Sequence, residues 1–391
     1  MKRSPFSGAF AAATLASLML AGCGGGGTST TDSSLTTHTD ASWAWSLPVN
    51  FATPAVPADN PMSEEKFQLG RRLFYDTRLS GNGTQACASC HLQHLAFTDG
   101  KAVATGSTGE LTARSAMPIA NAAYHPTFNW ANSGVTSLEQ QMETPLFGTN
   151  PVELGINDAN RAAVLQRFLG DADYTLRFTR AFPGEGSPVS FGNIIKAIAT
   201  FERGMLSGDS KYDRYQRGQA TLSASEERGR NLFFTEKAEC FHCHGSFNFN
   251  DQLRHAGSRS VETPFHNTGL YNIDGLGGFP APNRGLFEIT GKADDMGAFR
   301  APSLRNVAVT GPYMHDGSIA TLEAVLDFYA AGGRHITAGP LSGDGRNNPY
   351  KSDLISRIDL DAQEKADLVA FLKTLTDESL LTSSRFADPF K

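Results

Sequence analysis

Four of the five cysteines lie in two copies of one short pattern, CASCH at 87–91 and CFHCH at 240–244. In a C-x-x-C-H segment the thiols can bond to the vinyl groups of a haem, and the adjacent histidine can ligate its iron. A redox dithiol or half of a zinc site would not need that histidine. The sequence therefore predicts two covalently bound c-type haems, held by Cys87, Cys90 and His91 and by Cys240, Cys243 and His244, with His242 as a spacer.

Similar segments surround the two motifs. SEEKFQLGRRLFYD (63–76) precedes the first motif and SASEERGRNLFFT (223–235) precedes the second. A candidate closing helix follows each motif, at 190–206 and at 361–375, and Asp361 with Glu364 gives the second one a capping-box pattern. This repeat predicts a mainly α fold with long loops. It would contain two tandem cytochrome c-like domains, at 60–215 and 216–391.

A third segment, TLEAVLDFYAAGG (321–333), has the pattern of a short helix that starts at Thr321 and ends at a glycine pair. Tyr329 shares its apolar stripe with Leu322, Val325 and Leu326, so its phenol is expected to point inward. A core tyrosine that donates to a backbone carbonyl is the ordinary explanation.

The first 22 residues have the pattern of an export signal, with Lys2 and Arg3 before an Ala/Leu-rich run that is too short to span a membrane. LAGC resembles a bacterial lipoprotein signal in which Cys23 is lipidated, and an ordinary secretory signal is the alternative. Residues 23–59 read as a flexible tether and N-terminal segment. We therefore expect a periplasmic protein that contacts a membrane only through its lipid anchor.

The composition limits the possible partners. The formal net charge is −6 over 391 residues, and no basic run follows the N-terminus, which argues against nucleic-acid binding. The 39 glycines and 19 prolines predict a loop-rich chain.

The sequence resembles the bacterial di-haem cytochrome c peroxidase and MauG family over about residues 60 to 380. The markers are LGRRLFYDTRLSGNGTQACASCH, AFTDG, NPVELG, FHNTGL, APSLRNVAVTGPYMHDGS and TLEAVLDFY. The resemblance is closer to the MauG-like branch, and within it to the methanobactin-associated di-haem enzymes (the MbnH branch).

For the first haem, the resemblance implies an open iron that reacts with hydrogen peroxide. The peroxidases carry a closing histidine where this chain reads TGSTGELTAR (105–114), which contains none; His94 is too near the proximal turn, and His125 is the remaining candidate. Trp130 matches the tryptophan between the haems, Gln140 a distal glutamine and Glu153 the distal carboxylate. The spacing from Gln140 to Glu153 is a few residues longer than in the family.

For the second haem, the resemblance implies that Tyr329 is the sixth iron ligand, at the position where the peroxidases have methionine. Met296 and Met314 are the alternatives within reach. A calcium ion is also implied, with Asn121, Thr310 and Pro312 as its ligands, although such residues also make ordinary turns. His315 would hydrogen bond to a haem propionate or to backbone.

The function implied is a MauG-like oxidoreductase. It would use peroxide to form a high-valent two-haem oxidant and would oxidise a partner protein by long-range electron transfer. The closer resemblance to the MbnH branch implies that tryptophan is converted to kynurenine in a copper-binding partner. One alternative is a cytochrome c peroxidase that receives electrons from a small redox protein. A non-enzymatic di-haem electron carrier is another, although an open first haem disfavours it.

Overall fold

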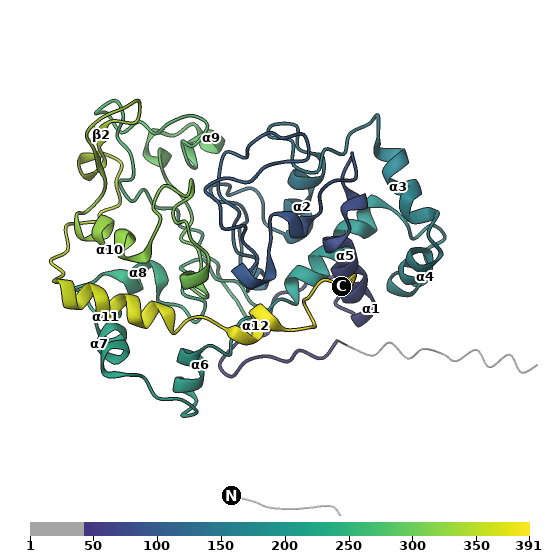
Figure 1. The fold of residues 1–391 in the computed structure, drawn as a ribbon, viewed down its shortest axis with the longest axis horizontal. Helices are drawn as coiled ribbons and strands as arrows, with labels where there is room; N and C mark the ends of the chain where they lie inside the picture. The colour runs from purple at the N-terminus through teal and green to yellow at the C-terminus, as the bar shows by residue number, and fades with distance from the viewer. Residues whose placement is uncertain (1–42) are drawn as a thin grey trace, which may run out of the picture. The chain divides into compact units, whose positions relative to one another are not determined.

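The computed structural model describes residues 43–391, which belong to one compact unit. The predicted export signal, Cys23 and the tether as far as residue 42 lie outside the described residues. The described part is mainly helical, as predicted, and Figure 1 shows its helices joined by long loops. Its α-helices are α1 (Glu64–Tyr75), α2 (Leu138–Phe147), α3 (Arg161–Leu169), α4 (Ala172–Ala181), α5 (Phe191–Arg203), α6 (Lys211–Gln216), α7 (Ala224–Phe233), α8 (Cys240–His244), α9 (Phe287–Thr290), α10 (Leu322–Ala330), α11 (Ala362–Lys373) and α12 (Glu378–Thr382).

Two helix pairs form the cores that support the two motifs. Helix α1 packs on α5, and α7 packs on α11. A β-carbon at Gly70 would collide with the carbonyl of Ala197, and one at Gly229 with the carbonyl of Asp367. Glycine thus lets each pair cross closely, which explains the Gly-Arg step in both repeats. The capping box of Asp361 and Glu364 is present at the start of α11.

Aromatic side chains fill both cores. Phe67, Phe74 and Phe201 are fully buried around α1 and α5, and Phe233 and Phe371 are buried around α7 and α11. Because residues 43–391 form one compact unit, the division at residue 215 remains a prediction.

Strand structure is minimal in the described residues. Strands β1 (His335–Ile336) and β2 (Gly343–Asp344) pair antiparallel, with His335 opposite Asp344. They close the loop that follows α10.

The C-terminal segment runs back from α11 to the first helix pair (Figure 1). Gln93 donates to the carbonyls of Leu380 and Ser383, and the Tyr75 hydroxyl donates to the carbonyl of Phe386 at 2.8 Å. This return ties the two ends of the described chain together.

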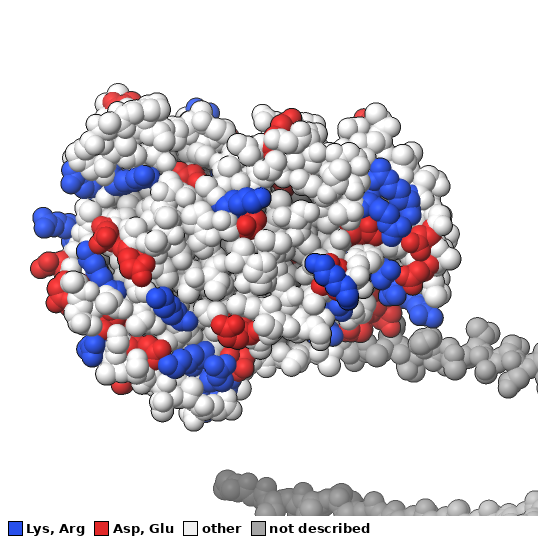
Figure 2. Space-filling view, in the orientation of Figure 1, with Lys and Arg blue, Asp and Glu red and all other residues white. Residues whose placement is uncertain are grey.

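Charges of both signs are interspersed on the face drawn in Figure 2, with wide uncharged areas between them. Within residues 43–391, no helix has the length and apolar character needed to cross a membrane.

Candidate haem sites and their surroundings

The first motif forms a tight turn that presents His91 to the interior. Cys87–Ser89 make a 3-10 turn, and the His91 Nδ1–H donates to the carbonyl of Phe97 at 2.7 Å. That bond fixes the ring and leaves Nε2 available for a metal. Burial lowers the pKa of His91, which favours the neutral imidazole that a metal needs.

The second motif repeats this arrangement. Helix α8 carries Cys240, Cys243 and His244, and the His244 Nδ1–H donates to the carbonyl of Phe249 at 2.8 Å. Phe97 and Phe249 both have positive φ angles, 65° and 52°. The sequence contains a pattern from which these two acceptors could be predicted. FTD (97–99) and FND (249–251) follow the two histidines at nearly equal spacing. His242 lies outside, with Nε2 at 2.9 Å from a Glu239 carboxylate oxygen.

A cavity, here called the second haem cavity, lies against α8 and is lined by Cys240, Cys243, His244, Tyr329 and the apolar stripe of α10. The Tyr329 hydroxyl has no hydrogen-bond partner within residues 43–391. An ordinary core tyrosine would donate to a backbone carbonyl, and no such carbonyl accepts from Tyr329 here. Burial raises the pKa of this phenol. Met314 lines the same cavity, whereas Met296 packs among Tyr271, Phe279 and their neighbours.

The polar groups of this cavity allow a test of whether haem fits. Arg300 and His315 are buried and line it, and the Arg300 Nε and the His315 Nε2 have no partner within the described residues. Burial lowers the pKa of His315 to about 4, so the ring is neutral at pH 7. A haem brings carboxylates that can accept from such donors. Two thiols, a pre-oriented imidazole and free buried donors therefore fit a covalently bound haem.

Glu153 lies close to the first motif. Residues 150–156 fold back along α2, since the Leu154 N–H donates to the carbonyl of Pro145. Burial raises the pKa of Glu153. Burial is also the main cause of the raised pKa values of the Cys87 and Cys90 thiols, and the nearby charge of Glu153 adds to both shifts. A carboxyl with a raised pKa beside the haem-attachment cysteines is suited to acid–base chemistry.

Gln140 does not lie with Glu153, which corrects the prediction. It is exposed on α2, and its Oε1 accepts from the Thr136 N–H at 3.1 Å. The buried face of α2 is set by Leu138, Met142 and Leu146, and residue 140 points away from it. The half-buried neighbour Gln141 turns toward Asn129, with its Nε2 at 3.4 Å from the Asn129 Oδ1. The structure therefore does not place Gln140 in a buried distal pocket.

Trp130 lines the second haem cavity from the first half of the chain. Its Nε1–H donates to the carbonyl of Ser115 at 2.9 Å, and the Ser115 N–H donates to the carbonyl of His315 at 2.8 Å. The indole is thus fixed at the contact between the two halves.

Comparisons with known proteins agree with this geometry. The model of the di-haem cytochrome c peroxidase family matches residues 64–221. The chain is 34% identical to the methylamine utilization protein MauG of Methylorubrum extorquens, over 91% of this chain and 92% of that protein. The chain belongs to the di-haem cytochrome c peroxidase and MauG family. It is therefore a di-haem oxidoreductase with two c-type haems, and the family implies hydrogen peroxide and a protein partner or electron donor.

Two further relatives show the breadth of this family. The cytochrome-c peroxidase IdrP1 of Denitromonas iodatirespirans is 35% identical over 82% of this chain and 84% of that protein. A crystal structure described as a MauG-like protein associated with microbial copper homeostasis is 61% identical, with a TM-score of 0.88. That likeness covers 89% of this chain and all of the solved one.

Asn121, one of the three residues that the family resemblance assigned to calcium, already uses its side-chain amide in bonds within the protein. The Asn121 Oδ1 accepts from the Ser207 N–H at 2.8 Å, and its Nδ2 donates to the Ser207 carbonyl and the Asn248 side chain. Thr310 and Pro312 instead line the second haem cavity. Asn121 has a φ of 61° and caps a 3-10 turn, as Asn306 does in the second half, so its amide has a structural role. The predicted calcium ligand set stays a prediction.

His125 is buried beside Phe128, and burial together with Arg300 holds its pKa well below the usual range. Its Nε2 has no hydrogen-bond partner within the described residues.

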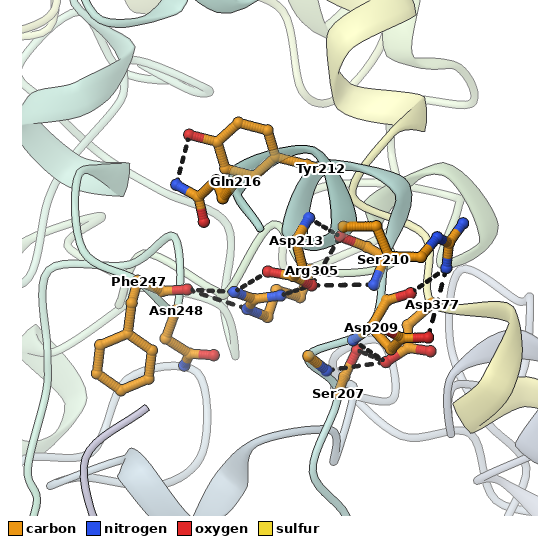
Figure 3. Close-up of polar contacts among 12 residues, drawn as sticks. Ser207, Asp209, Ser210, Tyr212, Asp213, Gln216, Phe247, Asn248, Arg305 and Asp377 are labelled. Atoms are coloured by element: carbon orange, nitrogen blue, oxygen red, sulfur yellow. Dashed lines mark hydrogen bonds and ion pairs between the residues drawn. The ribbon is translucent and has the colours of Figure 1, made fainter. Parts of the chain in front are cut away.

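A polar cluster fixes the segment between the two halves (Figure 3). The Asp377 carboxylate accepts from the Ser207 hydroxyl and from the backbone N–H groups of Gly208 and Asp209. The Asn306 Nδ2 donates to the same Ser207 hydroxyl at 3.0 Å. Ser207 therefore contacts both asparagines that cap the equivalent turns.

Glu202 on α5 was not singled out from sequence, yet it is fully buried close to Cys87. Burial raises its pKa to about 8; Arg203 opposes this shift and Glu139 adds to it. Between about pH 4.5 and about pH 8 the folded protein then holds a proton that the unfolded chain has lost. Stability should therefore fall as pH rises through this window, by roughly 1 kcal/mol per pH unit.

Glu202→Gln should remove this slope. Thermal unfolding of the haem-loaded protein across the window would show it as a flatter dependence of Tm on pH. Parallel curves for the two proteins would mean that Glu202 is ionised in the folded state.

Proposed function

We propose that this protein uses hydrogen peroxide to oxidise a side chain of a separate protein, and that peroxide removal is not its main task. The observation that carries this proposal is Tyr329, whose half-buried, unpartnered phenol lines the same cavity as His244. A phenolate donor favours oxidised iron, whereas the methionine of electron-accepting haems favours reduced iron. The tyrosine thus suits a site that stores oxidising equivalents.

The side chains of this protein have three roles in the proposal. Bound haem supplies the iron that reacts with peroxide and holds the oxidising equivalents. Glu153 holds a proton on its carboxyl and gives it to the departing oxygen of peroxide. His91 is kept neutral and oriented by the Phe97 carbonyl. Trp130, fixed by Ser115, lies on the route for electrons between the two halves.

The proposed substrate is a tryptophan in a copper-binding partner, converted to kynurenine. The sequence resemblance and the 61% identical protein, described as associated with microbial copper homeostasis, support it. The chemistry balances when the indole loses four electrons to two peroxide molecules, giving N-formylkynurenine and two waters. One water then hydrolyses the formyl group, which leaves as formate.

The proposed location is the periplasm, with Cys23 lipidated and the chain held to a membrane only by that anchor. We also propose a calcium ion held by the amide oxygen of Asn121 and the carbonyl oxygens of Thr310 and Pro312.

The test is to incubate the haem-loaded protein with peroxide and each protein encoded beside its gene, and then to map masses on both chains. The expected result is one partner peptide whose tryptophan has become kynurenine, only when peroxide is present. Peroxide consumption that requires a reduced electron-donor protein, with every partner peptide unchanged, would instead support the peroxidase function. The observation that favours this second candidate, the peroxidase function, is Met314, because it lines the second haem cavity and methionine is the ligand of electron-accepting haems.

A further inference from the structure

Arg300 carries a buried charge that no carboxylate of the described residues pairs with. The residue is 3% exposed. Its Nη1 donates to the Thr127 carbonyl at 2.7 Å, and its Nη2 approaches the Met117 sulfur at 3.6 Å. Its Nε has no partner in residues 43–391. A buried guanidinium is strongly disfavoured unless a carboxylate bonds to it and its N–H groups have acceptors, so a partner outside the polypeptide is indicated.

Arg305, five residues later, shows how this protein pairs a buried arginine. It is also 3% exposed, and its Nη1 and Nη2 donate to the two oxygens of Asp213 at 2.8 and 3.1 Å (Figure 3). Its Nε donates to the Phe247 carbonyl at 3.0 Å. Every part of this guanidinium has an acceptor, which is the opposite of Arg300.

The carboxylate of Asp251 does not form an ion pair with Arg300. Asp251 is close enough to raise the pKa of Arg300, but burial outweighs it and lowers that pKa to about 10. The Asp251 Oδ2 is bonded to the His266 Nε2 at 2.5 Å. No ion pair between Asp251 and Arg300 exists in the described structure.

The position of Arg300 indicates what its partner is. Arg300 lines the second haem cavity together with His244 and His315. Its backbone N–H donates to the carbonyl of Trp130 at 2.9 Å, and its guanidinium holds Thr127. Arg300 therefore lies between this cavity and the segment that carries the indole.

We propose that Arg300 is a positioning residue that binds a carboxylate of the second haem through its free Nε–H and fixes that haem against the Trp130 segment. The His315 Nε2 offers a second donor to the same carboxylates. The proposal rests on haem attachment at the second motif and not on the identity of the oxidised partner.

This pairing has a consequence that can be measured. A positive charge near a redox centre favours its reduced form, and the effect is large where water is excluded. Arg300 should therefore raise the reduction potential of the second haem relative to a neutral residue at this position. The first haem should be affected much less, because its motif does not line this cavity.

The experiment compares Arg300→Gln and Arg300→Lys in the full-length, haem-loaded protein. Spectroelectrochemical titration would give the potential of each haem, and resonance Raman spectra would report the carboxylate bending bands. We expect Arg300→Gln to lower only the second potential and to shift one set of carboxylate bands. Arg300→Lys keeps the charge, so it should retain most of the potential while the bands still shift.

Arg305→Lys is the matched control. It disturbs an equally buried guanidinium that already has its carboxylate, so it should lower the unfolding temperature without moving either potential. Unchanged bands and potentials in both Arg300 variants would overturn the proposal, as would equal shifts at the two haems. If Arg300→Gln fails to take up haem, the test rests on the carboxylate bending bands of Arg300→Lys. Unchanged bands in that variant would also overturn the proposal. None of these readouts depends on oxidation of a partner.

Discussion

Replacing Glu153 by glutamine is expected to slow the reaction with hydrogen peroxide by about 10²-fold or more while both haems stay attached. Glutamine has nearly the same shape as the protonated acid, so the pocket should keep its packing, but the amide cannot give up the proton. Burial keeps the pKa of Glu153 above its ordinary value, so this carboxyl keeps its proton to a higher pH than an exposed glutamate does. Stopped-flow absorbance after mixing with peroxide would measure the rate.

The pH profile supplies a second readout. Because the acid form is the active one, the rate of the normal protein should fall as pH rises through the raised pKa of Glu153. The profile of Glu153→Gln should be flat over the same range. Gln140→Ala is the control, since that side chain is exposed on the outer face of α2. Equal slowing in both variants would point to a general disturbance, and a normal rate in Glu153→Gln would remove Glu153 from the mechanism.

The sequence predicted those parts of the fold that depend on residues close together in the chain. A C-x-x-C-H segment brings its own haem-binding groups, and the capping box at Asp361 and Glu364 lies within one helical turn. The inward direction of Tyr329 followed from its spacing to Leu322 and Leu326, which are buried on the same helix. Each of these three features can be predicted without knowing which distant segments pack against it.

The misplaced residues depend on packing between distant segments. Gln140 and Gln141 are adjacent and identical in type, so only the orientation of α2 against its core distinguishes them. Asn121 is a plausible metal ligand in sequence, and only the fold shows that its left-handed backbone brings its amide to the Ser207 backbone. The burial of Glu202 and the missing partner of Arg300 could be recognised only from the fold.

Tyr329→Phe should abolish the low-spin spectrum of the second haem while peroxide still reacts at the first. Removal of one hydroxyl leaves an aromatic ring of almost the same volume, so α10 should keep its packing. A ferric ion favours the phenolate strongly enough to overcome the raised pKa that burial gives Tyr329. Absorbance and electron paramagnetic resonance spectra of the resting ferric protein would report the change, and the variant should lose partner oxidation.

Tyr313→Phe is the matched control, because Tyr313 lines the same cavity but its hydroxyl already donates to the Val307 carbonyl at 3.0 Å. It should keep the low-spin spectrum. Tyr329→Met should instead give an easily reduced second haem and peroxidase-like behaviour. If Tyr329→Phe retains the original spectrum, the tyrosine is only a packing residue. The ligand would then have to be sought first at Met314, which lines the cavity, and next at Met296, which packs against the same apolar cluster as Met314 but does not line the cavity.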